Sequence, residues 1–87
     1  EEFAIILPET SLEQTAELSE RLLEKVRTAE IEYVADIKIS LTTSIGVASF
    51  PPFSIDFDTV MNEADKALYR AKLDGRDCCR GTINDDL

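Results

Sequence analysis

The sequence of 87 residues contains no histidine, no tryptophan and only two cysteines, Cys78 and Cys79, which are adjacent. The lack of histidine excludes histidine-based catalysis within the chain and leaves too few ligands for a zinc site. Adjacent cysteines bridge each other only with strained geometry, so we expect two reduced cysteines on a short strand. No apolar run approaches the ~20 residues of a membrane span, and the sequence has no signal-peptide pattern. We therefore expect a cytoplasmic protein without direct membrane contact.

Positive charge is also scarce, because nine lysines and arginines are outnumbered by eighteen aspartates and glutamates, for a net charge of −9. Such an acidic chain is poorly suited to nucleic acid or anionic membranes, so we expect neither as a partner. The exception is residues 66–80, where five basic side chains exceed two acidic ones; the basic residues are Lys66, Arg70, Lys72, Arg76 and Arg80. A basic segment inside an acidic protein suits a small anion such as a nucleotide phosphate.

The first third of the sequence predicts a strand followed by a helix. The apolar run at residues 3–7, ended by Pro8, is typical of a short strand buried on both faces. A helical stripe then predicts a helix over about residues 11–29. Two capping boxes are candidates for its start, Thr10 with Glu13 and Ser11 with Gln14.

The middle of the sequence predicts one long strand. Residues 37–47 alternate between large apolar side chains and small or polar ones, which is the period of a strand. Gly46 within this segment indicates a bulge or a close backbone approach. Pro51 and Pro52 are predicted to end the strand.

The last third predicts a second helix and a short strand. Residues 54–58 are typical of a loop that supplies a helix cap, and residues 60–71 form an apolar helical stripe. Gly75 is the predicted residue after this helix. A final strand is predicted near residues 78–82, followed by a frayed tail at 83–87.

The predicted order is therefore β-α-β-α-(β), which indicates an α/β or α+β domain with helices packed on a sheet. Two or three strands make a marginal sheet, so we expect the missing strands to come from upstream or from a second copy. Open strand edges favour pairing with another chain. We therefore expect a homodimer, either swapped or paired through the sheet.

Three segments together carry a resemblance to a known family. In order and spacing, "EEFAIILPETS", "ISLTTSIGVASFP" and "ADKALYRAKLDGRD" resemble the second half of the GGDEF family, the diguanylate cyclases. Residues 1–3, Glu-Glu-Phe, match the last positions of the motif Gly-Gly-(Asp/Glu)-Glu-Phe. The resemblance implies a ferredoxin-like, nucleotidyl cyclase palm with an antiparallel sheet and packed helices. We expect residues 1–87 to be its C-terminal half, with the glycines and the other metal-binding aspartate upstream.

The resemblance also implies an activity for the parent protein. The family condenses two GTP molecules into cyclic di-GMP and pyrophosphate for bacterial second-messenger signalling, with two domains each holding one GTP. The ribose 3′-hydroxyl attacks the α-phosphate with the help of Mg²⁺ or Mn²⁺, which carboxylates hold. The parent is expected to be a nucleotidyltransferase that is attached to a membrane or sensor domain. The isolated chain is expected to have little or no activity.

The resemblance assigns roles to five residues. Glu1 matches the motif position that binds the metal and helps deprotonate the hydroxyl, and Glu2 matches a second carboxylate of the catalytic site. Lys72 and Arg76, four positions apart at the end of the second helix, match the residues that contact the GTP phosphates. Arg21 matches an arginine that completes the product-inhibition site in some members. The other basic residues of the segment 66–80 are interpreted as a solvated face. The apolar stripes are interpreted as core.

Several alternatives stay open. From composition alone, Glu1 and Glu2 are a charged terminus and Arg21 is a surface arginine. Lys72 and Arg76 are then ordinary charges that stabilise the C-terminus of a helix. The parent could also be a degenerate GGDEF domain that serves as a GTP or cyclic di-GMP binding or dimerisation module. A third hypothesis is a related palm that acts on another nucleotide.

Overall fold

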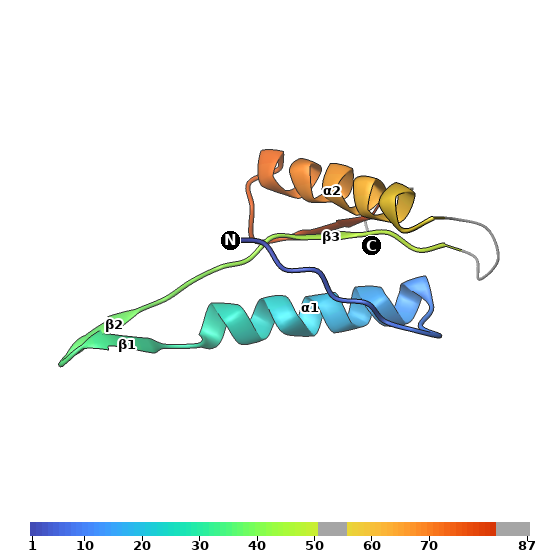
Figure 1. Cartoon of the computed structure of the whole chain (residues 1–87). Coiled ribbons are helices and arrows are strands. Elements are labelled where there is room, and N and C mark those ends of the chain that lie inside the picture. Colours follow the sequence, from blue (N-terminus) through green and yellow to red (C-terminus); the bar gives the residue numbers. More distant parts are fainter. Residues whose placement is uncertain (51–55, 82–87) are drawn as a thin grey trace.

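The structure is a computed structural model, and it describes residues 1–50 and 56–81. Within these ranges the chain is a mixed α/β fold with two helices and two small sheets of two strands each (Figure 1). The elements are α1 (Leu12–Thr28), β1 (Ile31–Val34), β2 (Ile37–Ile39), β3 (Ile45–Val47), α2 (Phe57–Leu73) and β4 (Cys79–Gly81). Neither described helix combines the length and the apolar character that a membrane crossing requires.

The body of the molecule has three layers, with the β3–β4 sheet between α1 and α2 (Figure 1). β3 and β4 pair in parallel, with Ile45 opposite Cys79, because α2 forms the crossover that connects them. Among the described strands, the expected antiparallel pairing occurs in the β1–β2 hairpin, and β3 and β4 are parallel. Leu23 of α1 is 1% exposed and packs with Val47 and Cys79, so the core holds α1 against both strands.

Small residues let α2 lie directly on β3. Ala67 and Ala71 are fully buried on α2. A Cβ atom at Gly46 would lie 2.3 Å from both the Ala64 carbonyl oxygen and the Leu68 amide nitrogen. The close backbone approach predicted from Gly46 is therefore confirmed.

The predicted helices are confirmed, and their ends are built by local hydrogen bonds. Ser11 caps α1, since its hydroxyl accepts the Gln14 N–H at 3.1 Å and the Gln14 side chain accepts the Ser11 N–H at 2.9 Å. Of the two candidate capping boxes, the structure uses this one. Asp56 caps α2 by accepting the Thr59 N–H at 2.8 Å, and this hydrogen bond lowers the pKa of the Asp56 carboxyl. Gly75, with φ of 111°, follows α2 as predicted.

The strand predicted at residues 3–7 is not formed. This segment runs as an irregular chain, and Phe3 and Ile6 are 88% and 71% exposed. Apolar character alone cannot make a strand, because the backbone groups need a paired neighbour. Among the described residues the β3–β4 sheet does not include this segment.

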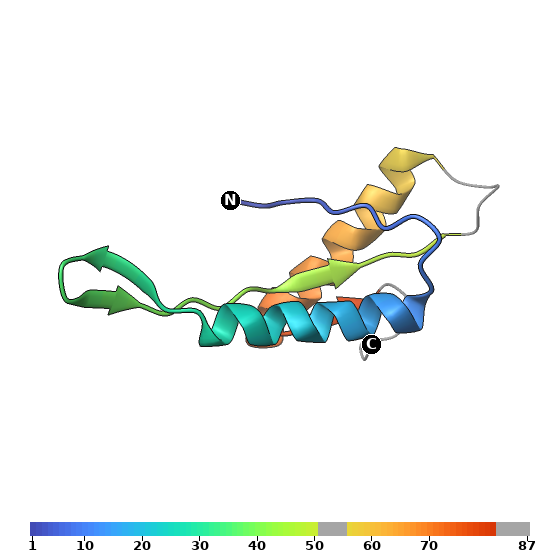
Figure 2. The ribbon, with the colours of Figure 1, turned by 90° about the horizontal axis from the view of Figure 1, so that it is seen from below.

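The single long strand predicted at residues 37–47 is also wrong. β2 and β3 occupy its two ends, and residues 40–44 between them are irregular. β2 instead pairs with β1, which the sequence reasoning missed, through a turn at Ala35 and Asp36 where Asp36 has φ of 69°. The hairpin projects away from the three layers (Figure 2). The two ends of the alternating segment thus pair with different partners.

The final strand is confirmed as β4, and both cysteines are free thiols. Cys79 lies on β4 and is buried, whereas Cys78 directly precedes the strand and is partly buried. Burial raises the pKa of the Cys79 thiol. Pro51, Pro52, part of the predicted loop 54–58 and the predicted tail at 83–87 lie outside the described residues.

Candidate functional site

The N-terminal segment brings one predicted site residue to the end of α2. The Lys72 ammonium lies 3.0 Å from the Glu2 carboxylate, with the two side chains 35% and 61% exposed. Lys72 is in the last turn of α2, and the N-terminus of the chain lies beside that end of the helix (Figure 1). The structure therefore joins a predicted catalytic carboxylate to a predicted phosphate-binding lysine.

Glu1 and Glu2 have the carboxylate chemistry that Mg²⁺ prefers, so they suit a divalent metal as part of a ligand set. Both residues are exposed. The described ranges contain no group of three or more histidine, cysteine, aspartate or glutamate side chains arranged to hold a metal ion. These two carboxylates consequently supply only a fraction of a coordination shell, and Lys72 already occupies one oxygen of Glu2.

Lys72 lies in the last turn of α2, whereas Arg76 lies beyond the end of the helix. α2 ends at Leu73, and Arg76 lies in the turn that follows. The physical reason is Gly75, whose left-handed backbone ends the helix. The Arg76 N–H then donates to the Ala71 carbonyl at 2.9 Å, which completes the helix cap. The Arg76 side chain is exposed beyond this cap.

Three residues that the sequence reasoning missed hold this turn. The Arg27 Nε, from the last turn of α1, donates to the Asp77 carboxylate at 2.8 Å, and its Nη2 donates to the Asp77 carbonyl at 3.1 Å. The Asp77 N–H donates to the Ser44 hydroxyl at 3.2 Å. The hydrogen bond to Asp77 is the main cause that raises the pKa of Arg27. An arginine in a final helical turn was the only sequence signal for this contact.

Two other basic residues of the segment 66–80 are structural, which corrects their assignment to a solvated face. Arg70 donates to the Gly81 carbonyl, and the Arg80 Nε lies 2.9 Å from the Asp74 carboxylate. Both side chains are partly buried and connect α2 with β4. Lys66, in contrast, is exposed as predicted.

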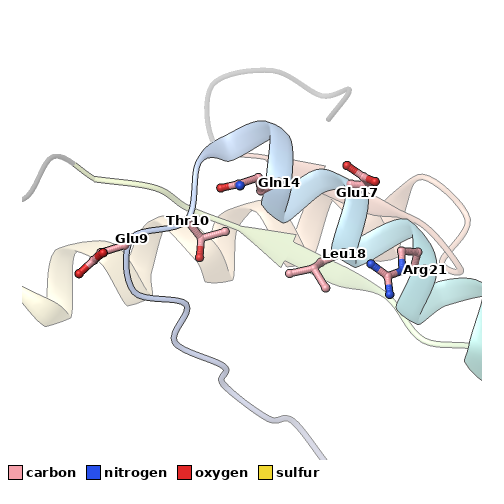
Figure 3. Close-up of a pocket in the computed structure, with 6 residues that line it drawn as sticks. All are labelled: Glu9, Thr10, Gln14, Glu17, Leu18 and Arg21. Carbon is pink, nitrogen blue, oxygen red and sulfur yellow. The ribbon is translucent and has the colours of Figure 1, made fainter.

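Arg21 borders a shallow hollow elsewhere on the chain (Figure 3). The hollow has a volume of about 360 Å³ and is lined by Glu9, Thr10, Gln14, Glu17, Leu18 and Arg21. These residues belong to α1 and to the segment that precedes it. None of the other predicted site residues lines this hollow, so the structure separates Arg21 from the Glu2–Lys72 contact.

The comparison with protein families identifies the class. The family model described as "Diguanylate cyclase, GGDEF domain" matches residues 1–78, and the chain belongs to this family. The resemblance seen in the sequence is therefore confirmed. The match begins at the carboxylate pair and extends through Lys72 and Arg76 to Cys78.

Individual relatives support the same class. The chain is 39% identical over 77 residues to "Diguanylate cyclase DgcP" of Pseudomonas aeruginosa, covering 88% of this chain and 11% of that protein. It is 37% identical over 76 residues to "Diguanylate cyclase A" of Treponema denticola, covering 87% and 20%. It is also 37% identical over 76 residues to "Uncharacterized protein YhcK" of Bacillus subtilis, covering 87% and 21%. The chain thus spans 11% to 21% of the length of these relatives.

Proposed function

We propose that the protein carrying this chain is a diguanylate cyclase, which joins two GTP molecules into cyclic di-GMP and releases pyrophosphate. The observation that carries the proposal is the 3.0 Å ion pair between Glu2 and Lys72. It places a carboxylate of the family motif beside the lysine expected to bind phosphate, although 70 positions separate them. Membership of the GGDEF family and the names of two relatives support the same activity.

In this proposal residues 1–87 are the C-terminal half of the catalytic domain. The 3′-oxygen of each GTP loses its proton and forms a bond to the α-phosphorus of the other GTP. At each α-phosphorus the bond to the bridging oxygen of the β-phosphate breaks, so two pyrophosphates leave. Glu1 would hold Mg²⁺ or Mn²⁺, and Glu2 would be the second carboxylate of the catalytic site. A bound divalent cation would polarise the phosphate oxygens and lower the pKa of the attacking hydroxyl. Lys72 and Arg76 bind phosphate oxygens through charge-assisted hydrogen bonds. Their positive charge offsets the charge of the leaving pyrophosphate.

The test is the conversion of GTP to cyclic di-GMP by the full-length protein, separated by anion-exchange chromatography. Glu2→Gln is expected to lower kcat by about a hundredfold, as for loss of one electrostatic group in an active site. Lys72→Met is expected to raise KM for GTP by about tenfold, the effect of one charge-assisted hydrogen bond. Lys66→Met is the matched control, because Lys66 is an exposed lysine on the same helix. It should leave both constants unchanged.

Three results would contradict this function. A wild-type rate in Glu2→Gln would show that this motif carboxylate takes no part in the reaction. Binding of GTP or cyclic di-GMP without turnover would identify a degenerate GGDEF module instead. A preference for ATP over GTP would indicate a palm that acts on another nucleotide.

The isolated chain is proposed to be inactive and to pair with a second copy. Glu1 and Glu2 provide too few metal ligands alone, and the family uses two domains that each hold one GTP. Apolar side chains that a pairing partner would cover are exposed at Phe3, Ile6 and Ile37. We expect a sheet-paired or swapped dimer by light scattering of the 87-residue chain. A monodisperse monomer would refute the dimer, and robust cyclic di-GMP synthesis would refute the inactivity.

A further inference from the structure

The turn after α2 has an unfavourable backbone at two residues. Gly75, Arg76 and Asp77 have φ angles of 111°, 63° and 51°, so three consecutive residues are left-handed. Glycine adopts this conformation freely, but in arginine the Cβ atom is crowded against the backbone, which raises the conformational free energy. Such backbones persist only where surrounding contacts determine them, and they concentrate at functional sites. The left-handed backbone at Arg76 must therefore be held by the contacts around the turn.

Those contacts converge on the residue that follows Arg76. Arg27 donates to both the carboxylate and the carbonyl of Asp77, at 2.8 and 3.1 Å, and the Asp77 N–H donates to Ser44 at 3.2 Å. On the other side, the Arg76 N–H is held by the Ala71 carbonyl. The Arg76 backbone is thus fixed at both ends while its side chain is left exposed.

We propose that Arg27 and Asp77 are positioning residues, which hold the backbone of Arg76 so that its guanidinium meets the nucleotide phosphate. The inference rests on the proposed function, because it needs Arg76 to contact phosphate. A fixed backbone removes the cost of ordering the turn when the nucleotide binds. The planar guanidinium of Arg27 suits this task because its Nε and Nη2 donate to two oxygens in a fixed fork, which the single ammonium nitrogen of a lysine does not provide.

Stability alone does not account for this ion pair. The Arg27 and Asp77 side chains are 37% and 36% exposed. Ion pairs at such exposure contribute little to the free energy of unfolding. Their removal should therefore change nucleotide binding far more than it changes the melting temperature, which separates a positioning role from a structural one.

The experiment measures KM for GTP, the Kd of a non-hydrolysable GTP analogue and the melting temperature of the full-length protein. Arg27→Gln and Asp77→Asn are expected to raise KM and Kd by about tenfold, as for a lost hydrogen bond to a charged group. kcat and the melting temperature should stay close to wild type. Arg27→Lys should give an intermediate KM, because lysine keeps the charge but lacks the rigid planar fork of the guanidinium. Lys25→Gln, in the same turn of α1, is the control and should change nothing.

A double-variant cycle gives the decisive comparison. If Arg27 acts through Arg76, adding Arg27→Gln to Arg76→Ala raises KM no further, whereas independent effects multiply. A wild-type KM and Kd in Arg27→Gln and Asp77→Asn, with a raised KM in Arg76→Ala, would overturn the inference and leave the proposed function intact. Multiplying effects would also overturn it. An unchanged KM and Kd in Arg76→Ala would overturn both the inference and the phosphate role of Arg76.

Discussion

Replacing Gly46 with alanine tests the contact on which the three layers depend. The added Cβ would lie 2.3 Å from the Ala64 carbonyl oxygen and the Leu68 amide nitrogen, and 2.7 Å from the Leu68 Cα. All three are backbone atoms of α2, so no side chain can rotate away. An increase from 2.3 to 3.4 Å, where ordinary contact begins, requires α2 to move by about 1.1 Å. That movement would also loosen the packing of α2 on β3.

Insertion of one methyl group into a packed core lowers the free energy of unfolding by about 1–3 kcal/mol. We expect about 3 kcal/mol for Gly46→Ala, because the helix backbone that the new methyl group meets is rigid. This loss is a large fraction of the roughly 5–15 kcal/mol that stabilises a typical domain. Urea unfolding of the purified protein, followed by circular dichroism, measures this loss of stability. The midpoint urea concentration should fall, while the dependence of the unfolding free energy on urea stays unchanged. The matched control is Gly75→Ala, where the new Cβ has no atom within 4 Å. It should cost only about 1–2 kcal/mol, from the left-handed backbone.

A second variant distinguishes a backbone clash from a side-chain clash. Shortening Leu68 to alanine should not rescue Gly46→Ala, because the clash involves the amide nitrogen and Cα of Leu68. The reasoning would be refuted if Gly46→Ala were as stable as wild type. Full recovery in the Gly46→Ala, Leu68→Ala double variant would refute it as well.

Three further predictions concern the helix caps and the thiols. Ser11→Ala should lower the free energy of unfolding by about 1 kcal/mol in urea titrations, because the Gln14 N–H loses its acceptor; an unchanged midpoint would contradict the cap. Cys78 should react with a disulfide reagent before Cys79, whose raised pKa delays thiolate formation to higher pH; mass spectrometry of the first adduct checks the order. The Asp56 carboxyl, with its lowered pKa, contributes stability above its unfolded pKa and loses it as the pH falls through the folded value. Asparagine at position 56 can still cap the helix but does not titrate. In urea titrations, the free energy of unfolding should therefore fall less on acidification for Asp56→Asn than for wild type.

Local patterns predicted the helices well because the interactions that start and end a helix lie close together in sequence. The Ser11 cap uses a residue three positions away, and Gly75 ends α2 through its own backbone. The apolar stripes then identified the buried faces, including Leu23 and Ala71. These features need no information about the rest of the fold.

Strand pairing was predicted poorly because it depends on partners that are distant in sequence or absent from the sheet. Residues 3–7 have strand composition but no pairing partner among the described strands. Residues 37–47 have one continuous alternation, yet Ile37 pairs with Val34 while Ile45 pairs with Cys79. Composition cannot distinguish these outcomes, since a backbone hydrogen bond requires a particular neighbour.

The sequence alone identified the family and predicted the candidate site residues and the two helices, because each of these depends on contiguous segments. The three-dimensional arrangement decided which of those residues meet. Glu2 reaches Lys72 across 70 positions, and Arg27 reaches Asp77 across 50. The Arg27–Asp77 contact forms where the last turn of α1 meets the turn after α2, and the Glu2–Lys72 contact forms where the N-terminal segment meets the last turn of α2. Both pairs join residues that are distant in sequence, so no local pattern could have predicted either of them.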